Sequence, residues 1–387
     1  MYILIISRGY PSEKYKMNGI FEFDQAKALV EAGHKVIYAA IDVRSFRRKR
    51  KWGFESLTKD GVQIEAINIP CGRIPKSILD RIRIVALRIL YKKIESKYGK
   101  PDIIHAHFIN SGYITAKVFD DSSIPLVLTE HYSAMNQKTL SSYYKRLGNY
   151  TYPRMNKVIA VSKYLANGLS QKFNIEPLIV PNIVDLSCFK YNDNKRKKQN
   201  DNFIIISVGS LIKRKRMDML IEAFYHVFGS HKHIKLYIYG EGPERKYLEK
   251  MIKIYSLTDQ IFLMGLASRE EIAKRMSESN YFVLASQLET FGVAYIEAMA
   301  MGLPVIATKC GGPEDFITDK NGILIPPNNK DALIDAMKYM YYNHSKYDGK
   351  TIAYGIRKLF SPETIADRLE QIYKSVVENG GIQRDKA

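Results

Sequence analysis

Residues 281–308 of the chain read YFVLASQLETFGVAYIEAMAMGLPVIAT. The apolar run YFVLAS is typical of a buried strand, and the polar loop QLETFG follows it. The apolar segment from about Gly292 to Met301 predicts a helix, and PVIAT predicts the next strand. The stretch therefore predicts a strand–helix–strand unit of a parallel sheet.

The same alternation of strand and helix signals extends over the whole chain. A helix pattern at 20–32, which Gly33 ends, lies between two apolar runs. Further strands are predicted at 2–7, 102–108, 125–131, 156–162, 203–209, 234–240, 261–265 and 322–326. A chain of 387 residues is longer than a single hydrophobic core usually accommodates, so we expect two domains. The alternation of strands and helices predicts the α/β fold class, with a doubly wound parallel sheet in each domain.

Composition places the domain boundaries. Residues 191–201, YNDNKRKKQND, are polar throughout and interrupt the alternation. We therefore predict an N-terminal domain at 1–185, a linker at 186–202 and a second domain at 203–360. A C-terminal helix at about 361–387 is expected to pack back on the first domain.

The net charge of +19 is unevenly distributed. Residues 1–185 carry 29 Lys and Arg against 16 Asp and Glu, which accounts for 13 of these charges. Such residues beside apolar ones suit an anionic membrane surface, although a solvated charged face is an equal alternative. Nucleic acid is not expected, since no binding motif accompanies the charge. The membrane-docking candidates are Arg47, Arg48, Lys49, Arg50, Lys51, Trp52, Arg81, Arg83 and Arg88.

The N-terminus and the cysteines bear on location. MYILIISRGYPS lacks the basic region of a signal peptide, and no window is apolar for long enough to span a membrane. Cys71, Cys188 and Cys310 are far apart, which favours a reducing compartment. We expect a cytoplasmic protein, peripheral at the inner face of the cell membrane.

Two glutamates in the opening stretch are candidates for ligand recognition. Glu289 lies in the loop and Glu297 in the expected helix, and Gly292 leaves backbone N–H groups at the helix start that suit a phosphate. The alternative is a surface glutamate and a second one that only interacts with the helix dipole.

These glutamates, within ETFGVAYIEAMAMGLPVIAT and before GGPEDFI and NGILIP, resemble the donor-site signature of glycosyltransferase family 4. VGSLIKRKRMDMLIEAF, YIYGEGPERKYLE, LIVPNIVD, NGIFEFDQAKALVEAGHKV, PDIIHAHF and PLVLTEH extend the resemblance over nearly the whole chain. It implies the GT-B fold, in which two Rossmann-like domains face each other across a cleft. It also implies a retaining enzyme of the bacterial surface-polysaccharide type.

The resemblance implies roles for individual residues. Glu289 would bind the donor sugar and Glu297 the ribose, while Lys215, assisted by Arg214, would neutralise the diphosphate. His131 would stand near the reacting sugar. The other donor contacts that it implies are Gly19, Gly209, Gly240, Leu266, Phe291, Gly292 and Val293.

The chain departs from the family pattern at several positions. Ser210 stands where many members have Arg, and Lys215-Arg216 replaces a Lys-Gly pair. The first change puts the strength of diphosphate binding in doubt, although the neighbouring basic residues could compensate.

The implied reaction is transfer from a nucleotide-diphosphate sugar, UDP rather than GDP, to a hydroxyl of a polysaccharide or lipid-linked oligosaccharide precursor. It would need no cofactor and no metal, since the sequence has no Asp-x-Asp. The alternatives are a nucleotide-sugar epimerase of the same fold, a nucleotide-dependent dehydrogenase and a basic binding protein. His105 and His107 are expected to face opposite ways on their strand, with His105 structural.

Overall fold

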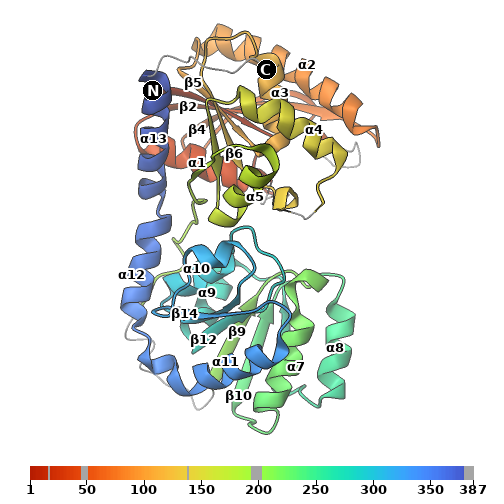
Figure 1. Cartoon of the computed structure of the whole chain (residues 1–387), viewed down its shortest axis with the longest axis vertical. Coiled ribbons are helices and arrows are strands. Elements are labelled where there is room, and N and C mark those ends of the chain that lie inside the picture. Colours follow the sequence, from red (N-terminus) through yellow and green to blue (C-terminus); the bar gives the residue numbers. More distant parts are fainter. Residues whose placement is uncertain (16–17, 45–50, 137–138, 193–202, 379–387) are drawn as a thin grey trace. The chain divides into compact units, whose positions relative to one another are not determined.

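The computed structural model describes residues 1–15, 18–44, 51–136, 139–192 and 203–378 (Figure 1). The chain forms two compact units. The first combines Met1–Ile183 with Pro362–Ala387, and the second is Val184–Ser361. Each unit is an α/β fold built on one sheet, which confirms the expected fold class.

The sheet of the first unit has the order β3-β4-β2-β1-β5-β6-β7-β8 within the described residues. All neighbouring strands pair in parallel except β3, which is antiparallel to β4. The strands are β1 (Tyr2–Ser7), β2 (Lys35–Arg44), β3 (Gly53–Lys59), β4 (Val62–Pro70), β5 (Ile103–His107), β6 (Leu126–Glu130), β7 (Lys157–Ala160) and β8 (Leu178–Ile179).

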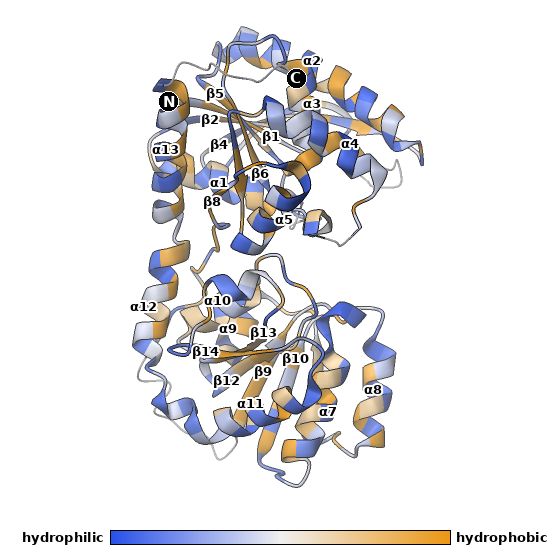
Figure 2. Ribbon diagram, in the orientation of Figure 1, coloured by the Kyte–Doolittle hydropathy of each residue, from blue (hydrophilic) through white to orange (hydrophobic). Residues whose placement is uncertain are grey.

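Helices cover both faces of this sheet because its buried strands are apolar on both sides. Leu4 and Ile6 of β1 pack with α2 to α5, whereas Ile3 and Ile5 pack with α1 and α13. The helices are α1 (Ile20–Glu31), α2 (Lys76–Tyr98), α3 (Phe108–Val118), α4 (Ser142–Thr151), α5 (Lys163–Phe173) and α13 (Pro362–Glu378), with 3₁₀ turns η1 (Ser133–Asn136) and η2 (Tyr152–Arg154). Figure 2 shows the hydrophobic strands inside these amphipathic helices.

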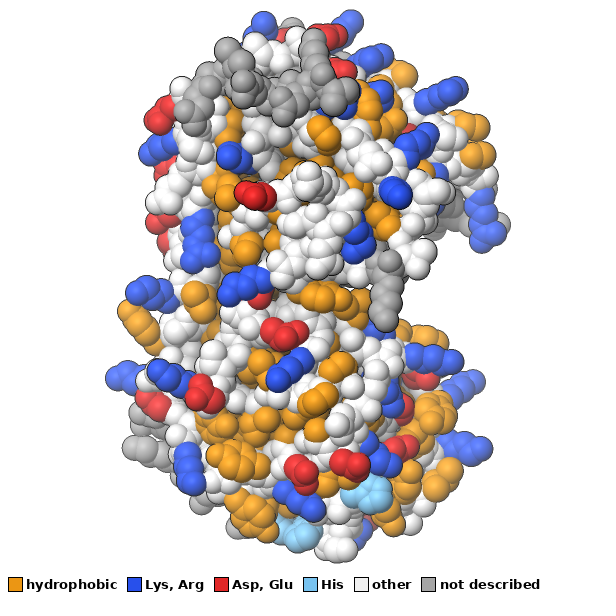
Figure 3. All heavy atoms as spheres, viewed as in Figure 1, with side chains coloured by type: hydrophobic (Ala, Val, Ile, Leu, Met, Phe, Trp, Pro, Cys, Tyr) orange, Lys and Arg blue, Asp and Glu red, His pale blue; other side chains and the backbone are white. Residues whose placement is uncertain are grey.

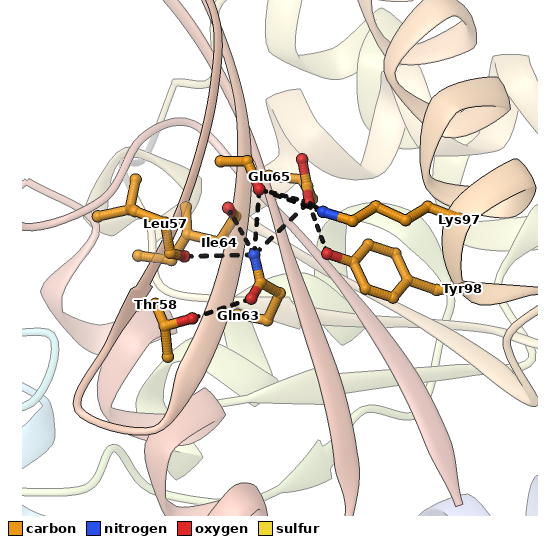
Figure 4. A network of polar contacts seen from close by, with 8 residues as sticks. Leu57, Thr58, Gln63, Ile64, Glu65, Lys97 and Tyr98 are labelled. Carbon is orange, nitrogen blue, oxygen red and sulfur yellow. Dashed lines mark hydrogen bonds and ion pairs between the residues drawn. The ribbon is translucent and has the colours of Figure 1, made fainter.

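The β3–β4 hairpin was not among the predicted strands. Asp60 and Gly61 both have positive φ at its tip, as a two-residue hairpin turn requires. Glu65 of β4 ties the hairpin to the end of α2, since Lys97 Nζ and Tyr98 Oη donate to it at 3.0 and 2.7 Å (Figure 4). Burial alone would raise the pKa of Glu65, but hydrogen bonds from Tyr98, Lys97 and Ser56 outweigh it and hold the pKa below its usual value.

The second unit has a parallel sheet in the order β11-β10-β9-β12-β13-β14, again within the described residues. A single apolar core runs through it. The strands are β9 (Phe203–Val208), β10 (Ile234–Tyr239), β11 (Ile261–Gly265), β12 (Tyr281–Leu284), β13 (Val305–Thr308) and β14 (Gly322–Ile325). The helices are α7 (Met217–Phe228), α8 (Arg245–Ile254), α9 (Arg269–Ser277), α10 (Val293–Ala300), α11 (Lys330–Asn343) and α12 (Gly349–Phe360), with 3₁₀ turns η3 (Lys213–Lys215), η4 (Gly312–Asp315) and η5 (His344–Lys346).

The start of the predicted linker belongs to the second unit. Leu186 and Phe189 are buried in its core, because the first residues after 185 include apolar side chains. Residues 193–202 of the predicted linker lie outside the described residues. At the other end, Ile365, Leu369 and Tyr373 of α13 are buried in the first unit.

Candidate active site

The loop between β12 and α10 is the centre of the candidate donor site. Gly292 caps α10 with φ 100°, a left-handed conformation that favours glycine. Val293 begins the helix, and Phe291 anchors the loop by packing edge-on against Phe316 and Phe360. The first N–H groups of α10 therefore follow Glu289 by a few residues. They lie at the carboxyl edge of the sheet, where α/β folds bind ligands.

Glu289 is held in place by three strand-end loops. Its backbone N–H donates to the Cys310 carbonyl at 3.0 Å, and its own carbonyl accepts from Gly312 N at 2.8 Å. Its carboxylate accepts from Ser286 Oγ at 2.6 Å and forms an ion pair with Lys215 Nζ. Glu289 is only 8% exposed, and its carboxylate is oriented by the Ser286 hydroxyl and the Lys215 ammonium. Neither contact was predicted from the sequence.

Lys215 reaches Glu289 because η3 is attached to the same loop. Gln287 N donates to the Arg214 carbonyl at 2.8 Å. Arg216 then turns the chain into α7 with φ 51°, a left-handed conformation that is uncommon for a residue other than glycine. Two hydrogen bonds from Arg216 Nε to the Asp218 carboxylate, at 3.1 and 3.2 Å, hold this turn.

Glu297 lies in the second turn of α10 with a different partner. It accepts from Arg269 Nη2 at 3.0 Å, and Arg269 also pairs with Asp185 at 3.1 Å. Burial raises the pKa of Glu297, while Arg269 opposes the shift. Arg269 was not among the predicted site residues. Glu297, which was predicted to contact the ribose, therefore forms an ion pair with Arg269 in this structure.

Gly209 and Gly240 lie at the ends of two neighbouring strands. Gly209 N donates to the Tyr239 carbonyl at 2.9 Å. A side chain at Gly240 would approach the Gly209 carbonyl oxygen to 2.1 Å, so the close contact of these loops requires glycine. Gly240 N also donates to Gly265 O, next to Leu266, which is 82% exposed. The predicted donor contacts Gly209, Gly240 and Leu266 thus lie on adjoining loops.

A pocket of about 570 Å³ adjoins this region of the second unit, within the size range of ligand sites. Lys213, Arg216, Tyr247 and Gln287 are among its described lining residues. Lys213 and Arg216 are close to Lys215 in the chain, and Gln287 belongs to the loop that carries Glu289.

In the first unit, Gly19 enters α1 with φ 69°. A side chain there would approach the Gly9 carbonyl oxygen to 2.2 Å, and Tyr38 Oη donates to the same oxygen at 2.8 Å. Gly19 is therefore required by the packing of its own loop, and phosphate approach at this loop stays a prediction.

His131 follows β6 and belongs to a buried imidazole cluster. Its Nε2 lies 3.0 Å from His107 Nδ1, and Phe108, strained at φ 65°, places its ring 4.7 Å from the His131 ring. Burial lowers the pKa of His131 to about 3, so the ring is neutral at physiological pH. Glu130, which the sequence prediction missed, accepts from the backbone N–H of His131 and fixes this loop.

The expectation that His105 and His107 face opposite ways is wrong. Residues two apart on a strand share a face, and the two rings lie 4.3 Å apart. His105 bonds Tyr373 Oη at 2.6 Å and Thr129 Oγ1 at 2.7 Å, so it links β5 to α13 and β6. Among the described residues, no group of three or more His, Cys, Asp or Glu could hold a metal ion.

This cluster predicts a pH dependence of stability. Burial lowers the pKa of His105 and His131 to about 3 and that of His107 well below its usual value, so the unfolded chain binds more protons below about pH 6.5. Stability should therefore fall as pH decreases from about 6.5, by about 1.4 kcal/mol per pH unit for each histidine. Urea unfolding at several pH values measures the slope. His105→Gln should reduce the slope by the contribution of one histidine, about 1.4 kcal/mol per pH unit. An unchanged slope would contradict the assignment.

Both parts of the chain match known protein families. Residues 189–358 match the family described as "Glycosyl transferases group 1", and residues 23–187 match "Glycosyltransferase Family 4". The chain is a GT-B glycosyltransferase of the family 4 type. Glu289, Lys215 and Glu297 lie within the first match, and His131 lies within the second.

Curated relatives of this glycosyltransferase are distant in sequence. The GPI3 subunit of phosphatidylinositol N-acetylglucosaminyltransferase from Saccharomyces cerevisiae is 23% identical over 71% of the chain, and the match spans 63% of that relative's length. Alpha-monoglucosyldiacylglycerol synthase from Acholeplasma laidlawii is 26% identical over 68% of the chain and 73% of its own length.

Solved structures share the fold of the glycosyltransferase over nearly its full length. Sucrose-phosphate synthase from Thermosynechococcus elongatus has a TM-score of 0.78 at 22% identity, covering 98% of this chain and 100% of the other. Anabaena HepE, in complex with UDP and glucose, has a TM-score of 0.73 at 18% identity, covering 97% and 100%.

The membrane-docking candidates of the glycosyltransferase separate into groups. Arg47, Arg48, Lys49 and Arg50 lie outside the described residues. Lys51 and Trp52 are exposed at the start of the β3–β4 hairpin, and Arg81 and Arg88 are exposed on α2. Arg83 does not belong with them, because it lies on the inner face of α2, 3.7 Å from the buried Asp80.

The exposed face of α2 is amphipathic. Ile78, Val85 and Ile89, each about half exposed, form a stripe at helical spacing beside Arg81 and Arg88. Figure 3 shows apolar and basic side chains next to each other in the region of α2. No helix in the described part of the chain is both long and apolar enough to cross a membrane.

Proposed function

We propose that this glycosyltransferase moves a sugar from a nucleoside diphosphate, UDP rather than GDP, to a hydroxyl of a lipid-linked or saccharide acceptor, with retention of anomeric configuration and without a metal ion. The observation that carries the proposal is the Lys215–Glu289 ion pair, held beside the N-terminus of α10. The complex of the structural relative HepE with UDP and glucose supports a UDP-sugar donor.

The charges of this site suit a diphosphate leaving group. As the bond between the anomeric carbon and the phosphate oxygen breaks, negative charge grows on the phosphate. Lys215 and the N–H groups of α10 would stabilise that charge, and Lys215 would exchange its contact with Glu289 for the phosphate. Glu289 would then accept hydrogen bonds from the sugar hydroxyls.

The acceptor oxygen would bond to the anomeric carbon on the face from which the phosphate leaves. The departing phosphate oxygen would take the acceptor proton, so the reaction requires no protein nucleophile. His131, neutral because of its burial, could donate or accept one hydrogen bond to the reacting sugar without adding charge.

The donor can be tested with a panel of UDP-, GDP-, ADP- and dTDP-sugars. Thermal shift should show stabilisation by one UDP-sugar and by UDP, both with EDTA present. Preferential stabilisation by a GDP-sugar, or stabilisation that EDTA abolishes, would contradict the proposed donor or the metal independence.

The acceptor is proposed to lie at an anionic membrane surface, which the face of α2 would contact. The names of both curated relatives include a lipid, which supports this location. The exposed apolar stripe would insert between head groups while Arg81 and Arg88 attract anionic lipid.

Replacing both Arg81 and Arg88 with Gln should weaken binding to phosphatidylglycerol-containing vesicles by roughly 30-fold, since each basic residue near an anionic surface contributes about 1 kcal/mol. Vesicle sedimentation measures the change. The double variant Lys246→Gln/Lys250→Gln, which removes two exposed charges from α8 in the second unit, is the matched control. Equal sedimentation of the α2 variant and the control would refute docking by α2.

A further inference from the structure

A second pocket lies entirely within the first unit and has no role in the donor site described above. Its volume is about 220 Å³, and it lies at the carboxyl ends of β1 and β5. Arg8 follows β1, and Asn110 lies in the first turn of α3. The opposite wall is formed by Lys76 and Arg83 of α2 with two aromatic residues of α4.

The pocket combines three cations with carboxylates that are already engaged. Arg83 Nη1 lies 3.7 Å from Asp80 Oδ1, and Tyr143 Oη donates to both Asp80 oxygens at 3.0 Å. Arg8 lies 3.7 Å from Glu22, which is fully buried. Burial raises the pKa of both Asp80 and Glu22. The described residues that line the pocket include Arg8, Lys76 and Arg83 but no carboxylate, so the balance of charge in the pocket is positive.

The cations are positioned for a ligand by aromatic and polar neighbours. Lys76 Nζ lies 4.7 and 5.1 Å from the ring centroids of Tyr143 and Tyr144, so the two aromatic faces position the ammonium. Asn110 Nδ2 donates to Tyr143 Oη at 3.1 Å and fixes that phenol. The ammonium is thus left able to donate to an anion.

The size of the pocket limits what it can hold. Pockets for drug-sized ligands are typically about 300–1,000 Å³. A pocket of about 220 Å³ suits one charged head group instead. Lys and Arg together are the residues that bind phosphate oxygens most effectively.

We propose that this pocket binds a phosphate group carried by the acceptor. The inference rests on the proposed function and adds that the acceptor is anionic next to its accepting hydroxyl. One helix would serve both parts of such a molecule. Lys76 and Arg83 of α2 face the pocket, while Ile78 and Val85 are exposed on its other side. A phosphate attached to a lipid could therefore enter the pocket while its chain stays in the bilayer.

Calorimetric titration of the full chain tests the pocket with two probes. Glycerol 3-phosphate presents a free phosphate ester, and monomeric dihexanoyl phosphatidic acid presents the same group on acyl chains. Lys76→Gln and Arg83→Gln should each weaken binding of the probes by about 10- to 150-fold, the effect of losing one charge-assisted hydrogen bond. Lys92→Gln, exposed on the same helix, is the control and should bind like the wild type. Tighter binding of the lipid than of glycerol phosphate would identify a lipid as the source of the phosphate.

Equal affinity in the wild type and both pocket variants, or an equal loss in the Lys92 control, would overturn the proposal. Arg83→Gln removes a partner of the buried Asp80, so if it fails to fold, Lys76→Gln decides the test. UDP titration of the same variants separates the two proposals. UDP should bind all of them equally, and a wild type that binds phosphate probes but no nucleotide would count against the donor and not against the pocket.

Discussion

Glu289→Gln is expected to lower kcat/KM for sugar transfer by at least about 10²–10³-fold, the usual effect of removing one preorganised contact to a transition state. The substitution keeps the size of the side chain and an acceptor for Ser286 Oγ, but it removes the charge that pairs with Lys215. Glutamine is a weaker acceptor for sugar hydroxyls, and the loss should appear mainly in kcat.

UDP affinity separates this role from a general effect on the site. Because Lys215 is released from its ion pair in Glu289→Gln, UDP should bind as well as in the wild type or better. Glu222→Gln is the control and should keep full activity, because the partly exposed Glu222 carboxylate pairs with Lys330 on the surface of the second unit. Near-normal transfer by Glu289→Gln would remove Glu289 from the reaction.

Lys215→Met is expected to weaken UDP binding by about 10- to 150-fold, since a hydrogen bond to a charged group contributes about 1.5–3 kcal/mol. It should also destabilise the second unit by about 3 kcal/mol, because Glu289, with a side chain only 10% exposed, would lose its cation. Titration with UDP and urea unfolding measure the two effects. Lys250→Met is the control for loss of a surface charge.

The double variant Lys215→Met/Glu289→Gln tests the pair directly. Stability should return towards that of the wild type, since neither charge is then left without its partner, whereas transfer should stay absent. Additive losses of stability in the double variant would show that the two side chains do not act as a pair.

The fold could be predicted because its strands are apolar runs in a regular order. The β3–β4 hairpin was missed because its strands alternate with polar residues beside a conspicuous basic run. The Asp60-Gly61 pair at its tip was the available signal. The wrong orientation of His105 and His107 came from misapplying the two-residue period of a strand, not from missing information.

The candidate site was predicted only as far as motifs reach. The loop that carries Glu289 and the αL cap at Gly292 follow from the local sequence. The cationic partners do not, because Lys215 and Arg269 reach the glutamates from parts of the chain that are distant in sequence. Ser286 lies only three residues before Glu289 in the same loop, but its hydrogen bond was not predicted either. Arg216, which stands where the family pattern has glycine, has the positive φ that glycine favours, so the backbone keeps at this position the conformation that a glycine would adopt most easily.

The most direct test of the account is proton NMR of the full-length enzyme incubated with its UDP-sugar and acceptor in EDTA. The wild type should give a new glycosidic anomeric signal with the configuration of the donor and should release UDP, and Glu289→Gln should lose both. A product of inverted configuration, or an epimerised sugar formed without any acceptor, would contradict it.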